Sequence, residues 1–248
     1  MKTVLITGCN RGLGLEFVRQ LVNFKSPPAK IIATCRSLEK AQELKSLQAQ
    51  NKSVHIIEID VTNFESYNVT AKRVKELVGD DGLNLLINNA GITTKFTRLN
   101  MVKLEQIMDN FTVNTAAPIM LTKSLLPLLK AAAAKSPSSP LGANRAVVVN
   151  MSSILGSIEL NKKEGGFYPY RASKAAINAA TKSMSIDLKS EGIMTICMHP
   201  GWVQTDMGGK QAPLKPDKSI KGMLDVFSNL KPEHNGLFLQ YDGAVLPW

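Results

Sequence analysis

The sequence predicts one α/β domain, residues 1–248, with a doubly wound parallel sheet of about seven strands and helices on both faces. Three observations predict it. Short apolar segments alternate with amphipathic ones along the chain, which is the pattern of strand–helix–strand units. The apolar segments VLIT, KIIATC and AVVVN suit strands that are buried on both faces. A glycine-rich loop follows the first of these segments.

The expected strands are short apolar runs, rich in β-branched residues and followed by polar or turn-forming residues. In chain order they are Thr3–Thr7, Lys30–Cys35, Val54–Ile59, Leu83–Ile87, Ala146–Asn150, Thr195–His199 and Gly236–Tyr241.

Helices are expected where apolar residues recur every three or four positions, as Leu13, Phe17, Leu21 and Phe24 do. In chain order the expected helices are Leu13–Phe24, Glu39–Gln50, Glu65–Val78, about Val102–Ala134, Tyr170–Ser190 and a short one after Asp217.

The long middle helix contains Pro118 and Pro127, and we expect it to bend near them because proline removes a backbone hydrogen bond. The low-complexity stretch Ala131–Asn144 is expected to be a surface loop, since the next apolar strand follows it at once.

Charge and composition limit the possible partners. The net charge of +10 raises the question of an acidic partner. The lysines and arginines are scattered, however, and no zinc-finger or RNP-like pattern occurs, which argues against nucleic-acid binding. A dinucleotide is also a polyanion, so the positive charge could attract it as well as it would a nucleic acid. The alternative is that most of the excess consists of solvated surface lysines without a partner.

The cysteines and the start of the chain indicate a cytoplasmic protein. Cys9, Cys35 and Cys197 share no CxxC spacing and no cluster of histidines, which suits buried thiols in a reducing compartment and no metal site. The apolar run Lys2–Ile6 is typical of a first strand and too short for a signal peptide. No apolar segment is expected to approach the roughly 18 residues that a membrane span needs.

The loop Thr7–Gly14 reads TGCNRGLG and indicates a phosphate-binding turn. Gly8 permits the sharp turn, Gly12 lets a phosphate approach the backbone, and Gly14 lets the helix pack closely on the strand. The following helix N-terminus offers free N–H groups to a pyrophosphate. The glycines of this loop are spaced GxxxGxG, which differs from the general GxGxxG fingerprint. The alternative, that they only close a βα turn, therefore stays open.

The end of the second strand favours NADPH over NADH. NAD-binding enzymes typically have an acidic residue there, and this chain has Arg36 instead. Arg11 in the glycine loop can approach the same place, and two guanidinium groups suit a 2′-phosphate. Arg36 could also be a solvent-facing residue. Asp60, after the third strand, is placed to meet the adenine or to cap the next turn.

Tyr170 and Lys174 lie four residues apart on one face of a helix, which predicts a proton-transfer site. A nearby ammonium favours the phenolate and would lower the pKa of Tyr170 from its ordinary value near 10. Ser153 follows an apolar strand at the edge where such sheets bind ligands, and its hydroxyl can bind a substrate oxygen. A tyrosine–lysine pair alone could belong to an ordinary helix surface, and a serine after a strand is more common still.

These motifs resemble those of the short-chain dehydrogenase/reductase family, over nearly the whole chain. The matching segments are TGCNRGLG, NNAG at Asn88–Gly91, Asn114, Ser153, YRASK at Tyr170–Lys174, and His199–Gly201 with Thr205. The resemblance implies a Rossmann-like fold and a carbonyl reductase activity.

The resemblance also implies roles for individual residues. It implies a proton relay through Asn114, Ser153, Tyr170 and Lys174, in which Asn114 bends its helix and holds a water that links Lys174 to solvent. A homodimer through the middle helix and the Tyr170 helix is plausible. The implied cofactor-binding residues are Gly8, Asn10, Arg11, Gly12, Leu13, Arg36, Asp60, Val61, Asn89, Ala90, Gly91, Pro200, Gly201, Val203 and Thr205, with Tyr170 and Lys174.

The expected reaction is reduction of an apolar aldehyde, ketone or quinone by NADPH, with Tyr170 as proton donor. The expected pocket walls are mostly apolar and could also be ordinary packing. Met207–Lys218 could be a lid or a plain surface loop. The rivals are a non-catalytic NADPH-binding redox sensor and, more weakly, a nucleotide-sugar epimerase. The pocket walls are Ile92, Phe96, Leu155, Phe167, Tyr168, Trp202 and Met207.

Overall fold

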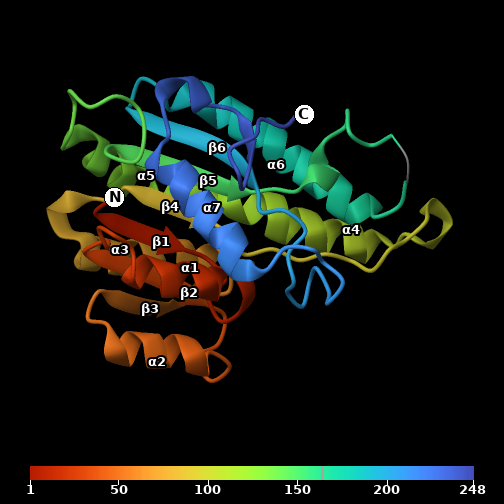
Figure 1. Ribbon diagram of the computed structural model, residues 1–248, viewed down its shortest axis with the longest axis horizontal. Helices are drawn as coiled ribbons and strands as arrows, with labels where there is room; N and C mark the ends of the chain where they lie inside the picture. The colour runs from red at the N-terminus through yellow and green to blue at the C-terminus, as the bar shows by residue number, and fades with distance from the viewer. Residues whose placement is uncertain (163–164) are drawn as a thin grey trace.

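The computed structural model describes residues 1–162 and 165–248 and has one seven-stranded sheet in the order β3-β2-β1-β4-β5-β6-β7 (Figure 1). All six neighbouring pairs are parallel, as the sequence predicts. The order reverses between β1 and β4, where doubly wound sheets bind ligands. The strands are β1 Thr3–Ile6, β2 Lys30–Cys35, β3 Val54–Glu58, β4 Leu85–Asn88, β5 Ala146–Met151, β6 Ile193–His199 and β7 Phe238–Gln240.

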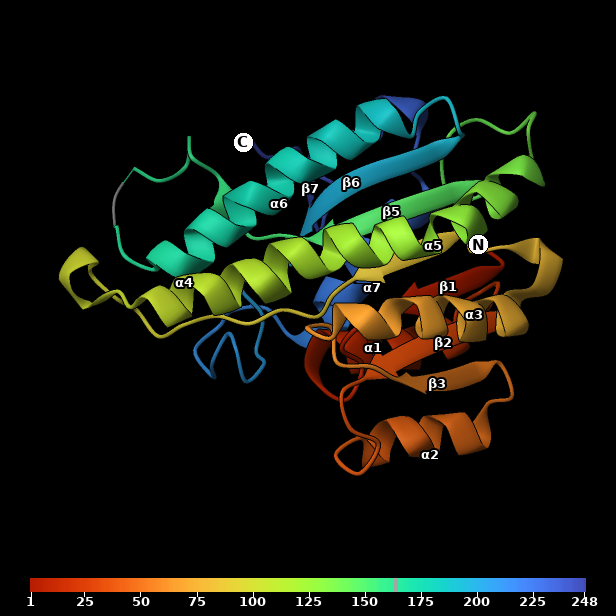
Figure 2. The same ribbon diagram turned by 180° about the vertical axis from the view of Figure 1, so that it is seen from behind.

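Helices cover both faces of the sheet. On one face α1 packs against α7 and α2, and the rings of Phe17 and Phe227 stack with their centroids 6.2 Å apart. The other face carries α3, α5 and α6, which lie in front of the sheet in Figure 2. The helices are α1 Gly12–Val22, α2 Gln42–Gln50, α3 Tyr67–Val78, α4 Leu104–Phe111, α5 Ala117–Ala134, α6 Tyr168–Asp187 and α7 Pro216–Ser228.

The middle helix has its irregular turn ahead of the first proline. Residues Thr112–Ala116 form a π-helical turn between α4 and α5, whereas Pro118 lies in the first turn of α5 and Pro127 inside it. The irregular turn thus lies next to Pro118, and the expected bend near Pro118 and Pro127 stays a prediction. Because Pro118 has no N–H, a carbonyl group of the preceding turn has no main-chain partner at that position. A π turn widens the helix locally, and such turns often occur at functional sites.

The same π turn joins α4 and α5 into one helix of 31 residues, Leu104–Ala134, with a mean hydropathy of 1.2 over its most apolar 18 residues. By length and composition alone this helix could cross a membrane, and the expectation of no such segment was wrong. Half of those 18 residues are buried inside the domain, as in a core helix of a globular protein.

A row of buried polar side chains links the middle strands to α6. The Asn88 side chain on β4 donates to Asn150 Oδ1 on β5 at 2.8 Å, and Asn150 Nδ2 donates to Thr181 Oγ1 on α6 at 2.9 Å. Asn150 is fully buried. Buried amides of this kind stabilise a fold only while their partners remain, because an orphaned donor loses its water without compensation.

Replacing Asn150 by alanine should lower the free energy of unfolding by about 2 kcal/mol, because two buried hydrogen bonds are lost. Urea denaturation of Asn150→Ala and of the matched surface variant Asn161→Ala would measure this. Asn161 is exposed, so its variant should stay within about 0.5 kcal/mol of the wild type. Equal effects of the two changes would show that the row contributes nothing to stability.

Candidate active site

The glycine loop lies against the end of β4 at the carboxyl edge of the sheet. Gly8 has a left-handed φ of +72°, and a Cβ there would lie 3.1 Å from Ala90 Cα. Thr7 Oγ1 accepts hydrogen bonds from the main-chain N–H groups of Asn89 and Ala90 at 3.0 and 2.9 Å. Asn89 Nδ2 donates to the Thr7 carbonyl oxygen at 2.8 Å. These contacts require a glycine at position 8 and fix the loop against the NNAG segment.

The first turn of α1 is open for a ligand. Arg11 stands at the N-cap and its side chain makes no capping hydrogen bond, and no acidic residue lies in the first turn. Gly12 has a φ of +57°, and a Cβ there would approach Thr205 Cγ2 at 3.7 Å. The glycine loop and the loop after β6 therefore face each other across the helix N-terminus, where an anion is electrostatically favoured.

The two arginines expected near a 2′-phosphate, Arg36 and Arg11, each lie near a different carboxylate. Arg36 is exposed at the end of β2, and its positive charge reaches Asp60. Asp60 Oδ1 accepts hydrogen bonds from the Thr62 main-chain N–H at 2.9 Å and from Thr62 Oγ1 at 2.8 Å, so this carboxylate caps the turn. The Thr62 main-chain bond, with smaller contributions from the Thr62 hydroxyl and Arg36, lowers the pKa of Asp60.

Arg11 carries an ion pair that the sequence did not reveal. Its Nη1 lies 2.6 Å from Oδ2 of Asp206, which is 195 residues away in the chain, and both side chains are largely exposed. Asp206 follows Thr205, so the pair joins the glycine loop to the loop after β6. The structure thus places Arg11 against Asp206, a partner that the spacing of the glycine loop cannot predict.

Three predicted catalytic residues come together between β5 and α6. Ser153 follows β5, its Oγ accepts a hydrogen bond from the Leu155 main-chain N–H at 3.1 Å, and its hydroxyl lies close enough to Tyr170 to act on the pKa of that phenol. Lys174 is 5% exposed, donates from Nζ to the Met151 carbonyl oxygen at 2.7 Å, and lies 5.7 Å from the centre of the Tyr170 ring. The neighbouring Ser152 instead donates to Asn178 Oδ1 at 2.6 Å.

Burial dominates the protonation of this group. It raises the pKa of Tyr170, and the Ser153 hydrogen bond opposes this rise. The expectation of a lowered pKa for the Tyr170 phenol was therefore wrong, because loss of water disfavours the phenolate. Burial also lowers the pKa of Lys174 to about 8, so its ammonium remains mostly charged at neutral pH. A protonated phenol beside a cation is the state required for donating a proton.

Asn114 lies in the π turn, and both polar atoms of its side chain are hydrogen-bonded. Its Oδ1 accepts from the Ile92 main-chain N–H at 2.9 Å, and its Nδ2 donates to the Ile92 carbonyl oxygen at 2.9 Å and to Ser173 Oγ at 3.0 Å. A Cβ on Gly91 would lie 3.2 Å from Asn114 Oδ1 and 3.7 Å from Lys174 Nζ. Gly91 is thus the point where Asn114 and Lys174 approach each other.

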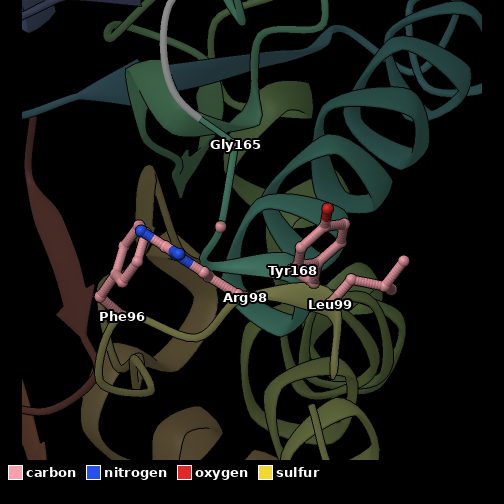
Figure 3. A pocket seen from close by; sticks show the side chains of 6 residues that line it. Phe96, Arg98, Leu99, Gly165 and Tyr168 are labelled. Carbon is pink, nitrogen blue, oxygen red and sulfur yellow. The ribbon is translucent and has the colours of Figure 1, made fainter. Parts of the chain in front are cut away.

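The expected pocket walls divide between two places. Phe96 and Tyr168 line a pocket of about 550 Å³, together with Arg98, Leu99, Gly165 and Gly166, which the sequence analysis did not select (Figure 3). Phe167 packs edge-on against Phe96, with ring centroids 5.2 Å apart. Arg98 is only two residues from Phe96, but no spacing pattern marked it.

The other expected walls belong to the loop after β6 or lie closer to the catalytic group. Trp202 and Met207 are about half exposed, and Trp202 Nε1 donates to the Gly208 carbonyl oxygen at 2.7 Å. Ile92 and Leu155 are partly buried. Val203 and Leu214 form a bridge that closes this loop on itself. Its use as a lid, expected for Met207–Lys218, stays a prediction.

The buried charge of Lys174 predicts a pH-dependent stability. The unfolded chain keeps this proton up to the ordinary pKa of 10.5, whereas the folded chain releases it near 8. Between these values the unfolded state holds more protons, so the contribution of Lys174 to the free energy of unfolding rises with pH. Below pH 8 the buried charge lowers the free energy of unfolding by an amount that does not change with pH.

The wild type should therefore gain stability relative to Lys174→Met as the pH rises from about 8 to 10.5, by at most about 1 kcal/mol per pH unit. Urea denaturation at several pH values in this window would measure the difference. Lys182→Met, at an exposed site on the same helix, is the matched control and should show no such trend. A stability difference for Lys174→Met that stays flat across the window contradicts the prediction.

Comparison with known proteins identifies the family of this chain. The profile of the family described as short chain dehydrogenase matches residues 2–215. An uncharacterized oxidoreductase of Schizosaccharomyces pombe, C663.06c, is 33% identical over 270 aligned positions that cover 100% of this chain and 98% of that protein.

Two solved structures are similar along the whole chain. The carbonyl reductase Sniffer of D. melanogaster is 48% identical with a TM-score of 0.98, and the match covers 100% of both chains. An NADPH-bound carbonyl reductase from chicken fatty liver is 39% identical with a TM-score of 0.93, covering 100% of this chain and 99% of that one. The chain described here belongs to the short-chain dehydrogenase family of oxidoreductases.

Proposed function

We propose that this protein is an NADPH-dependent carbonyl reductase in which Tyr170 donates the proton to the substrate oxygen. The observation that carries the proposal is that the partly buried Tyr170 lies with the buried Ser153 and Lys174 at the edge of the sheet that also holds the glycine loop. A carbonyl reduction needs a proton donor beside a cofactor site, and this edge combines the two. The similarity to two carbonyl reductases, one of them with NADPH bound, supports the same reaction.

The residues around the glycine loop fit a dinucleotide. The uncapped first turn of α1 and the left-handed Gly12 leave main-chain N–H groups free for a pyrophosphate. Asn89 to Gly91 and Pro200 to Thr205 flank this place, and Asp60 Oδ2 is left for the adenosine because the turn uses Oδ1. When bound, NADPH supplies the hydride for the reduction.

Arg11 and Arg36 support the choice of a phosphorylated cofactor. The ion pair of Arg11 with Asp206 uses Nη1, so Nε and Nη2 can still bind two oxygens of one phosphate. Arg36 is exposed at the end of β2, where an acidic residue would bind a ribose hydroxyl instead. Both guanidinium groups would hold the 2′-phosphate that distinguishes NADPH from NADH.

In the proposed reaction the side chains control one proton at the Tyr170 hydroxyl. The raised pKa of Tyr170 keeps this proton in place until a carbonyl oxygen accepts it. Ser153 donates a hydrogen bond to the same oxygen as negative charge develops there. The Lys174 ammonium stabilises the phenolate that remains.

Asn114 supports the group of Tyr170, Ser153 and Lys174 in two ways. It fixes the neighbouring segments, and its turn provides a route by which solvent can return a proton to Lys174. Its amide ties the Ile92 segment to α6 through Ser173. The π turn leaves main-chain carbonyl groups with weaker intrahelical partners, and these suit a bound water beside Lys174. We propose that Lys174 exchanges protons with solvent through such a water.

The rival function, a non-catalytic redox sensor, is less well supported. A sensor needs the cofactor site but has no use for a proton donor beside it. Burying Lys174 costs stability, and this cost is explained by a catalytic role. The apolar walls formed by Phe96 and Tyr168 favour an apolar aldehyde, ketone or quinone as substrate.

Replacing Tyr170 by phenylalanine should reduce kcat for carbonyl reduction about a hundredfold or more, because the proton donor is lost. The dissociation constant for NADPH should change less than about twofold, since the ring remains. Steady-state assays and fluorescence titration would measure these values. Tyr241→Phe is the matched control and should keep full activity. Near-normal turnover by Tyr170→Phe would refute its role as donor.

The double variant Arg11→Ala, Arg36→Ala should weaken NADPH binding about a hundredfold, or about tenfold for each lost charge-assisted contact. NADH binding should change by less than about threefold, because NADH has no 2′-phosphate. Fluorescence titration with both cofactors would test this, with the exposed Arg73→Ala as control. Equal losses for the two cofactors would contradict the assignment.

A further inference from the structure

The pocket before α6 has a wall that depends on an unusual backbone. Gly166 has a φ of +82°, and a Cβ there would lie 2.3 Å from Cε2 of the Phe96 ring. The next residue, Phe167, adopts a left-handed φ of 51°, which is uncommon for a residue with a side chain. This backbone lets Phe96 and Phe167 pack together at one wall. Strain kept in this way often marks a functional site.

The rim of this pocket is apolar, with one cationic group. Phe96, Leu99 and Tyr168 are 48%, 71% and 41% exposed, which is unusual for large apolar side chains gathered around one hollow. Arg98 stands among them, on the same side of the pocket as Phe96 in Figure 3.

Arg98 has no counter-ion among residues 1–162 and 165–248. In the described part of the chain its guanidinium makes no ion pair or hydrogen bond, whereas Arg11 and Arg19 are both paired with carboxylates. A pocket with apolar walls and a single free cation matches a ligand with an apolar body and one negative charge. A carboxylate fits best, because it accepts two parallel hydrogen bonds from one guanidinium group.

We propose that this pocket binds the carboxylate end of the carbonyl substrate, with Arg98 as the residue that determines specificity. The proposal rests on the proposed carbonyl reductase function and defines its substrate class as carbonyl compounds with an apolar body and a terminal carboxylate. Tyr168 lines the pocket and lies in the same first turn of α6 as Tyr170. To react, a substrate held by Arg98 at one end must run past the start of α6 to Tyr170, so the length of its apolar body decides whether the carbonyl group reaches the phenol. The net charge of +10 would assist capture of such an anion.

Paired substrates test this proposal. Straight-chain aldehydes of increasing length that end in a carboxylate, and their methyl esters, would be compared by NADPH oxidation. For the best length the wild type should show kcat/KM about tenfold higher for the acid than for the ester. Arg98→Ala should remove this preference mainly by raising KM for the acid, and Arg98→Glu should reverse it. Lys95→Ala, which removes a neighbouring charge outside the pocket lining, should keep the preference.

The outcomes separate the two proposals. If esters are reduced well and acids of every length are no better, or if Arg98→Ala affects both equally, the carboxylate site is wrong and the reductase function stands. If neither these aldehydes nor a panel of apolar ketones and quinones are reduced, the reductase function fails. A second measurement then decides the site alone: calorimetric titration with octanoate and with methyl octanoate. Binding of octanoate that weakens about tenfold in Arg98→Ala supports the site, and unchanged or absent binding overturns it.

Discussion

Hydrogen bonds from buried and partly buried side chains to the main chain hold together the loops at the carboxyl edge of the sheet. Asn89 binds the Thr7 carbonyl group, Asn114 binds both main-chain polar groups of Ile92, and Lys174 binds the Met151 carbonyl group. Each bond joins segments that are far apart in the sequence. Because these loops carry the glycine turn and the catalytic group, the geometry of the site depends on a few polar contacts that are shielded from water.

Lys174 shows how such a contact serves both structure and chemistry. Its ammonium is nearly inaccessible, and burial lowers its pKa to about 8. The bond to Met151 compensates part of the lost hydration and fixes the charge beside the Tyr170 ring. The same burial keeps Tyr170 protonated. In the proposed reaction this site releases one proton when negative charge appears on a neighbouring oxygen, without being ionised in advance.

The two ends of the proposed substrate site are built differently. Around Tyr170 the side chains are buried and extensively hydrogen-bonded. Around Arg98 the rings are half exposed, and the backbone of Gly166 and Phe167 is left-handed. A rigid interior positions the reacting atoms, whereas loops at the surface can change their side chains at little cost to the fold. Differences in substrate among related enzymes would therefore be expected at the Arg98 end.

The sequence by itself determined the alternation of strands and helices, the parallel sheet, the glycine turn, and the placing of Tyr170 and Lys174 on one helical face. These follow from local periodicity and spacing, which belong to the chain before it folds. Only the tertiary structure decided that Arg11 pairs with Asp206, that the irregular helical turn lies at Asn114 ahead of Pro118, and that Arg98 lies in a pocket. It also reversed the expected pKa shift of Tyr170. The reason is that ion pairing and loss of hydration depend on side chains brought together from distant segments, and no local pattern records them.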